Sequence, residues 1–367
     1  MNNRRPVKEI ASIIVITTIG TFLFSYLVFI ILQNEIPPSL ITIWNRWDTA
    51  HYLDIAQRGY SNTIIDERYL RIVFFPFYPL LIRLFAVIFR DYMLSALIVS
   101  NLAYASAAFY LYKLTLLDYT EETALRTVFY FSIFPTSYFL HASYTESLFL
   151  ALTIASFYYG RKEKWWLSGI IGMPASLTRI TGIILLPALI LEYIFQKGFH
   201  IKRINMDILW LSLIPLGFLL YLFTNYLVFG NPFEFLQIQK EHWAKTIDFP
   251  WKGLLGAWRS IWWRSPADSI LVGWAEAIFG VFGFLLTIWV SIRLRLSYGI
   301  YMLITWLVVT STSFWLSIPR YTLSMFPLFI AISLFGRIRE VNYLITFFSL
   351  LLLGLFLSLF IQGRWAF

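Results

Sequence analysis

Hydrophobic runs that are almost free of charge alternate with short charged segments along nearly the whole chain. Runs of about 20 apolar residues can span a bilayer as helices. With their ends taken from the flanking charges and aromatic residues, they predict about eleven transmembrane helices. The predicted spans are 10–33, 92–113, 124–141, 146–160, 166–178, 180–196, 206–229, 269–292, 298–316, 320–336 and 342–361. The pattern is that of an all-α, polytopic integral membrane protein, and residues 1–367 are predicted to form a single domain.

The positions of lysine and arginine predict which loops face the cytoplasm. If the N-terminus is cytoplasmic, five basic segments fall on the inside, as the positive-inside rule requires. They are 113–126, 161–164, 196–203, 293–295 and 336–340. This holds only if the run 74–89, with its two prolines and Arg83, lies at the interface instead of spanning. Residues 34–91 and 230–268 then form two long extracytoplasmic loops.

The composition limits the classes of molecule that the protein is expected to bind. The 367 residues are 59% hydrophobic and 13% charged, with 15 Trp, 22 Tyr and a formal charge of +9. No basic run is separate from the hydrophobic segments, so we expect anionic lipid headgroups or a phosphorylated lipid substrate, not nucleic acid. With no cysteine, the sequence offers no disulfide, thiolate metal site or cysteine nucleophile. The expected location is the cell membrane, which the chain crosses several times, with a cytoplasmic N-terminus and an extracytoplasmic active site.

The predicted topology gathers several ionisable residues on the extracytoplasmic side: Asp48, His51, Asp54, Glu146, Arg179, His242 and Arg320. In lipid such groups are costly, so they pair with one another, face water or do chemistry. Arginine offers paired donors to phosphate, and a carboxylate can remove a proton from a hydroxyl. This combination predicts a site for a lipid-linked phosphate substrate.

The residues of the first loop also have structural interpretations. Asp48 could instead cap a helix that begins at Thr49. Asp54 fits a solvated or ion-paired residue, with Arg58 four positions later. His51 on an aromatic-rich helix is more often a hydrogen-bonded structural residue than a ligand. One histidine and one aspartate on a turn are too few for a metal site, so we expect no metal and no cofactor.

The later residues have alternatives as well. Glu146 could stabilise the start of the helix that follows it, and Arg320 could extend to lipid headgroups. Residues 235–243 could form an ordinary interfacial helix. Arg179 is different, because an arginine in a turn between two short spans needs an anionic partner. We therefore favour a functional role for Arg179.

Six motifs in series resemble the PIG-V family, the mannosyltransferases that add the second mannose to glycosylphosphatidylinositol precursors, and its prokaryotic relatives. The resemblance covers about residues 44–330. The motifs are RWDTAHYLDIAQRGY, FFPFYPLL, SYTESLF, LTRITGIILLP, QKEHW and PRYTLSMFP. It implies a GT-C-type glycosyltransferase fold and a polyprenyl-phosphate sugar donor such as dolichyl-phosphate mannose. The acceptor would be a lipid or a glycan.

The resemblance also assigns roles to individual residues. Asp48 matches the acidic residue of the first loop and is expected to be the general base of an inverting transfer, with His51 orienting it or the acceptor. Arg179 and Arg320 are expected to bind the donor phosphate, although the first motif here has the looser form Arg-Ile-Thr-Gly. Substrate contacts are expected from Trp47, Glu146, His242 and Trp243. A flippase for lipid-linked sugars, an oligosaccharide ligase and a non-catalytic scaffold remain the alternatives.

Overall fold

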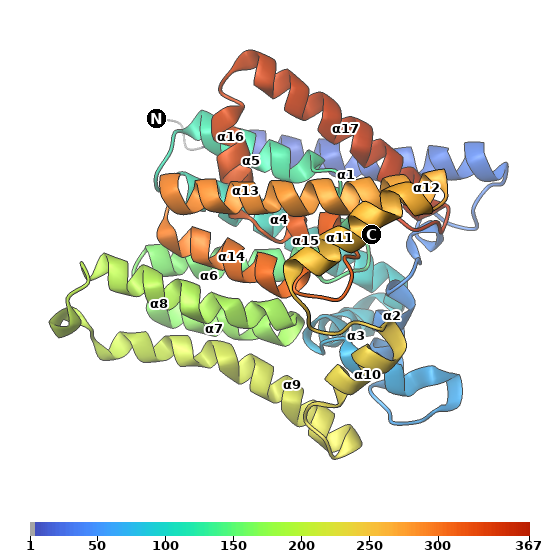
Figure 1. The fold of residues 1–367 in the computed structure, drawn as a ribbon, viewed down its shortest axis with the longest axis horizontal. Helices are drawn as coiled ribbons and strands as arrows, with labels where there is room; N and C mark the ends of the chain where they lie inside the picture. The colour runs from blue at the N-terminus through green and yellow to red at the C-terminus, as the bar shows by residue number, and fades with distance from the viewer. Residues whose placement is uncertain (1–3) are drawn as a thin grey trace.

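The computed structural model describes residues 4–367 and is built almost entirely of helices (Figure 1). The α-helices are α1 Arg4–Gln33, α2 Thr49–Arg58, α3 Phe77–Phe89, α4 Tyr92–Thr115, α5 Glu121–Ile133, α6 Glu146–Arg161, α7 Trp165–Thr178, α8 Leu185–Gln196, α9 Leu213–Phe229, α10 Glu234–Trp243, α11 Pro250–Trp263, α12 Pro266–Asp268, α13 Glu276–Arg293, α14 Leu296–Thr310, α15 Ile318–Leu323, α16 Pro327–Phe335 and α17 Arg339–Ile361. A π-helical stretch, Ser269–Ala275, joins α12 to α13. Within the described residues the only strand-like pairing is an isolated bridge between Ile247 and Thr312. The all-α prediction is confirmed.

Among residues 4–367, five helical segments are long and apolar enough to cross a membrane, so the chain is a multi-pass membrane protein. They are Val7–Gln33, Tyr92–Thr115, Met206–Phe229, Pro266–Arg293 and Arg339–Ile361. A sixth would result if Ile65–Val73 and α3, which meet at a bend of 118°, formed one span. The predicted total of about eleven is not confirmed. Two predicted spans are interrupted near prolines, since α5 ends before Pro135 and a break separates α15 from α16 at Pro327.

Close helix packing depends on small residues at the contact points. Gly217 of α9 lies against α7, where a Cβ atom would come within 2.1 Å of the Met173 carbonyl oxygen. Gly169 of α7 makes a similar approach to the backbone of Trp210. Such contacts let helix backbones approach closely where lipid provides no hydrophobic driving force. They hold α9 on the outside of the bundle, next to α7 (Figure 1).

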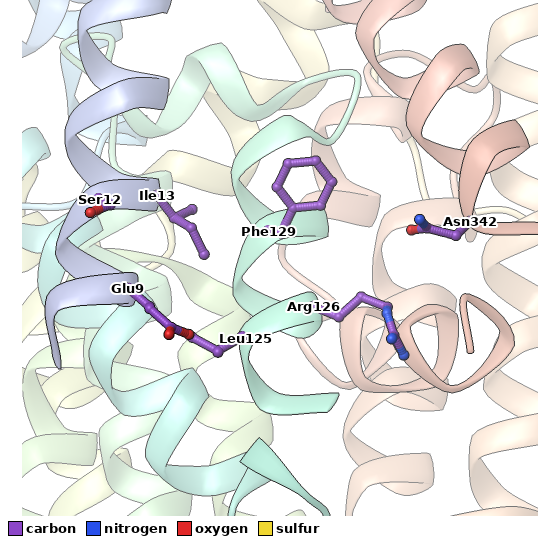
Figure 2. A pocket seen from close by; sticks show the side chains of 7 residues that line it. All are labelled: Glu9, Ser12, Ile13, Leu125, Arg126, Phe129 and Asn342. Carbon is purple, nitrogen blue, oxygen red and sulfur yellow. The ribbon is translucent and has the colours of Figure 1, made fainter. Parts of the chain in front are cut away.

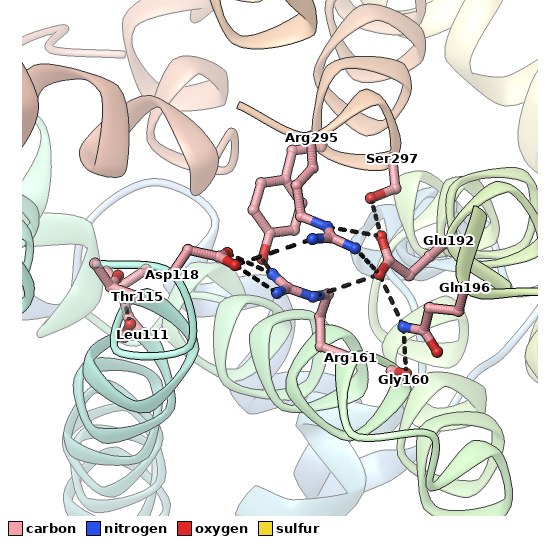
Figure 3. A network of polar contacts seen from close by, with 10 residues as sticks. Leu111, Thr115, Asp118, Gly160, Arg161, Glu192, Gln196, Arg295 and Ser297 are labelled. Atoms are coloured by element: carbon pink, nitrogen blue, oxygen red, sulfur yellow. Dashed lines mark hydrogen bonds and ion pairs between the residues drawn. The ribbon is translucent and has the colours of Figure 1, made fainter. Parts of the chain in front are cut away.

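A network of ion pairs joins the loops at one end of the bundle (Figure 3). Arg161, at the end of α6, donates to both carboxylate oxygens of Asp118 at 2.7 Å. Arg295 donates to Glu192 at 2.8 Å, and Gln196 also bonds to Glu192. These residues come from four of the segments predicted to be cytoplasmic, or lie beside them. The fold therefore brings to one end the loops that the charge pattern assigns to one side of the membrane.

The same end carries a pocket of about 480 Å³ between the beginnings of α1, α5 and α17 (Figure 2). Its lining residues are Glu9, Ser12, Ile13, Leu125, Arg126, Phe129 and Asn342. Arg126 already has polar partners: it donates to the Ser333 carbonyl at 3.2 Å and pairs with Glu122. This pocket is far along α5 from the residues predicted to do chemistry.

The two long loops cover the opposite end, where α6 begins. The first loop contributes α2 and α3, and the second loop contributes α10 and α11. The loops and α9 pack together through a small apolar cluster that includes Ile72, Tyr221 and Phe235. The Tyr221 hydroxyl donates to the Ile72 carbonyl at 2.7 Å. In Figure 1, α2, α3 and α10 lie together beside the right-hand ends of the long helices.

Candidate active site

Four of the predicted residues meet at this covered end. Asp48 precedes α2, Glu146 opens α6, Arg179 follows α7 and Arg320 lies in α15. Glu146 Oε1 accepts hydrogen bonds from Arg179 Nη1 and from Arg320 Nε, both at 2.5 Å. Arg320 Nη1 also donates to Asp48 Oδ2 at 3.1 Å. A chain of alternating charges therefore links four segments that are far apart in the sequence.

Glu146 is the buried centre of this chain. Its side chain has no exposed surface, and a buried carboxylate is tolerated only when it is paired and hydrogen-bonded. Its second oxygen, Oε2, has no hydrogen-bond partner among the described residues. The Arg320 guanidinium also lies 4.6 Å from the ring centroid of Tyr144 and 4.8 Å from that of Phe139. Glu146 is thus enclosed, and it fixes both arginines.

Asp48 is the accessible carboxylate, with 34% of its side chain exposed. Its side chain accepts no hydrogen bond from α2, so the helix-cap interpretation does not describe its contacts. Tyr144 fixes the backbone instead: its hydroxyl accepts from the Asp48 amide at 3.2 Å and donates to the Arg46 carbonyl at 3.1 Å. Arg320 holds Oδ2, while Oδ1 has no partner among residues 4–367. This leaves one oxygen available to an incoming hydroxyl.

His51 lies near Asp48 without a hydrogen bond to it. Its ring stacks on Phe74, with centroids 4.8 Å apart and an interplanar angle of 23°. Nδ1 is buried without a partner among the described residues. Burial lowers the pKa of His51, and the nearby Asp48 charge offsets part of this effect. The expected orienting contact between His51 and Asp48 is not seen, because the stacked ring is held by Phe74.

Asp54 belongs to a separate group of ion pairs. It pairs with Arg58, as the four-residue spacing predicts, and also with Arg71. Arg68 Nε lies 3.6 Å from its Oδ2. The side chain is buried, so the solvated interpretation is wrong and Asp54 acts as an anchor for the arginines of the first loop.

The aromatic and histidine candidates lie outside the charged chain. His242 Nε2 is 3.1 Å from the Tyr69 hydroxyl in an exposed contact between the two loops. Trp243 ends α10 and is 36% exposed. Trp47 packs edge-to-face against Trp365, with ring centroids 5.7 Å apart. His242 therefore contacts the first loop and lies outside the group around Asp48, and its role as a substrate contact stays a prediction.

Sequence reasoning missed Glu276. Both of its carboxylate oxygens accept backbone N–H groups at the start of α15, from Ser317 at 2.7 Å and from Ile318 at 2.8 Å. Ser317 has a φ of 71°, a left-handed conformation that is unfavourable for a residue with a side chain. Glu276 thus sets the position of the helix that carries Arg320. A lone acid within the predicted span 269–292 was the available indication.

Metal-binding residues do not cluster in the part of the chain that the structure describes. Within residues 4–367 no group of three or more His, Cys, Asp or Glu side chains is arranged to hold an ion.

The sequence is similar to known mannosyltransferases. Residues 75–228 match the family described as dolichyl-phosphate-mannose-protein mannosyltransferase. GPI alpha-1,6-mannosyltransferase 2 of Mus musculus is 29% identical over 162 residues, which cover 41% of this chain and 32% of that protein. GPI mannosyltransferase 2 of Cryptococcus neoformans is 29% identical over 165 residues, covering 42% and 36%. The resemblance to PIG-V-type mannosyltransferases is confirmed.

The similarity to these mannosyltransferases covers only part of their length. The chain spans about a third of the length of the curated relatives it matches. Among solved structures, ArnT from Cupriavidus metallidurans bound to undecaprenyl phosphate aligns with a TM-score of 0.55 at 12% identity. The alignment covers 87% of this chain and 59% of ArnT. This likeness shows that the chain shares its fold with ArnT.

Proposed function

We propose that this protein is a membrane glycosyltransferase that moves a hexose, specifically mannose, from a polyprenyl phosphate to an acceptor hydroxyl at the extracytoplasmic face. The observation that carries the proposal is the accessible Asp48 carboxylate, held by Arg320 within a chain of buried charges. The mannosyltransferase relatives support the sugar. The family description and the undecaprenyl phosphate bound to ArnT support the donor class.

In the proposed step, Asp48 Oδ1 takes the proton from the acceptor hydroxyl as its oxygen attacks the anomeric carbon. The bond between that carbon and the phosphate oxygen breaks, and its electron pair leaves with the polyprenyl phosphate. Attack from the face opposite the leaving group inverts the configuration. One carboxylate is sufficient, because the phosphate leaves without being protonated.

The arginines supply positive charge where the phosphate departs. Arg179 is 14% exposed and is fixed by Glu146, so it can neutralise the leaving group without reorganising. Arg320 already bonds to two carboxylates, so its main role is to orient Asp48. Glu146 is too enclosed to reach an acceptor, which favours Asp48 as the base. The acceptor, a lipid or a glycan, would enter from the side of the exposed Asp48 edge.

Purified protein in liposomes would test this proposal with labelled dolichyl-phosphate mannose and an extract of candidate lipid and glycan acceptors. In Asp48→Asn we expect transfer to fall by about 10²- to 10⁴-fold, the usual range for losing a general base. Asp91→Asn is the matched control: Asp91 lies in the same loop and caps α4, a role that asparagine also fills. Both variants should melt at the wild-type temperature.

The alternatives give different results. Wild-type transfer that survives in Asp48→Asn would contradict the assignment of the base. Transfer that is absent in the wild type, combined with movement of lipid-linked sugar across the bilayer, would identify a flippase.

A further inference from the structure

The segment that follows α10 is tied to the segment that leads into α15. Ser313 N–H donates to the Thr246 carbonyl at 2.9 Å, and Asp248 N–H donates to the Ser311 carbonyl at 3.1 Å. Ile247 and Thr312 form the isolated bridge between these hydrogen bonds. This pairing places the second long loop directly beside the approach to Arg320.

Lys245 is the charged residue that this pairing brings to the site. Its Nζ lies 5.6 Å from the ring centroid of Tyr321, the residue after Arg320. The guanidinium carbon of Arg179 lies 5.7 Å from the same centroid. Two cations from different segments therefore meet around one tyrosine ring, at the end of the chain of charges formed by Asp48, Arg320, Glu146 and Arg179.

Lys245 has no ion pair of its own among residues 4–367. Its charge acts on Glu276, but both oxygens of that carboxylate already accept backbone N–H groups. Arg179 and Arg320 are balanced by Glu146 and Asp48. No carboxylate among residues 4–367 lies within ion-pair distance of the Lys245 ammonium. Among the same residues, the Tyr321 hydroxyl has no hydrogen-bond partner. A half-buried lysine without an ion-pair partner, beside an arginine and an unused hydroxyl donor, is an arrangement that fits a bound anion.

We propose that Lys245, Arg179 and the Tyr321 hydroxyl form the binding site for the donor's phosphate group, an inference that rests on the proposed function. Arg320 is then a positioning residue for Asp48, and the second extracytoplasmic loop supplies part of the phosphate site. When the anomeric carbon–oxygen bond breaks, the phosphodiester becomes a monoester and gains negative charge. Lys245 therefore binds the released polyprenyl phosphate more strongly than the sugar-bearing donor.

The test compares Lys245→Met with Lys240→Met, since Lys240 is an exposed lysine of the same loop. Binding of dolichyl phosphate and of uncharged dolichol would be measured on purified protein, together with transfer from dolichyl-phosphate mannose. In Lys245→Met we expect dolichyl phosphate affinity to fall about 10-fold or more, the usual effect of losing a charged hydrogen bond. Dolichol binding, the acceptor KM and all properties of Lys240→Met should stay at wild-type values. Lys245→Arg should recover part of the lost affinity.

The outcomes separate this inference from the proposed function. If the wild type transfers mannose and Lys245→Met binds dolichyl phosphate normally, the phosphate site is wrong and the function stands. If the wild type neither transfers mannose nor prefers dolichyl phosphate to dolichol, both fail. If the wild type prefers dolichyl phosphate without transferring mannose, and Lys245→Met loses this preference, the phosphate site stands and the glycosyltransferase proposal fails.

Discussion

Removing the Glu276 carboxylate should displace Arg320, although Arg320 itself is not substituted. In Glu276→Ala, the backbone N–H groups of Ser317 and Ile318 lose their acceptors in a buried environment. Each unsatisfied buried donor costs about 1–3 kcal/mol, so the substitution should destabilise the protein by about 2–6 kcal/mol. The left-handed Ser317 is then free to relax, and α15 moves away from Asp48.

The effect would be measured as the thermal unfolding temperature in detergent and as the rate of mannose transfer. We expect Tm to fall by at least about 3 °C, and kcat to fall more steeply than any rise in the donor KM. Glu276→Gln should lie between wild type and alanine, because an amide offers only one acceptor oxygen to two donors. Asp268→Ala, an exposed acid just before the π-helical stretch, is the control. A Glu276→Ala protein with wild-type Tm and kcat would refute the role given to this carboxylate.

Two further substitutions test other parts of the fold. Burial lowers the pKa of His51 below its ordinary 6.5, so the unfolded chain binds more protons just below that pH. Wild-type Tm should therefore fall as the pH is lowered from about 7 to about 5.5, and it should fall less in His51→Phe. An equal fall in both proteins would contradict this reasoning. His200→Gln, at an exposed site, is the control. Arg161→Met leaves Asp118 without its paired donors and should cost about 1.5–3 kcal/mol, lowering Tm with the donor KM unchanged. An unaltered Tm would mean that the network in Figure 3 contributes no stability.

Periodicity and charge predicted the class of fold but not the number of spans. Apolar runs end where charges begin, so α1, α4 and α17 were visible in the sequence. Short apolar helices such as α16, with only 9 residues, are not separable by composition from a piece of a longer span. Pro135 and Pro327 were present in the sequence, but a proline can equally well kink a helix or end it.

The sequence predicted part of the candidate site, because the topology places its charged residues on one side of the membrane. Topology alone placed Asp48, Glu146, Arg179 and Arg320 on one side, and ion pairing inside a membrane then requires them to meet. His242 and Asp54 satisfied the same topological test, but side chains reach only their neighbours, and theirs are Tyr69 and three arginines. Which carboxylate is buried and which is accessible depends on packing, which no sequence pattern encodes.

The shortness of α6 has a consequence for the lipid around the protein. Glu146 begins this helix and Arg161 ends it, so a helix of 16 residues, or about 24 Å, holds the two charge clusters at its ends. The hydrocarbon core of a bilayer is about 30 Å thick. Either the surrounding leaflets thin, or the carboxylates and arginines sit below the level of the headgroups. If the proposed function holds, bilayers of shorter acyl chains should bring the lipid-linked donor and the acceptor closer to Asp48.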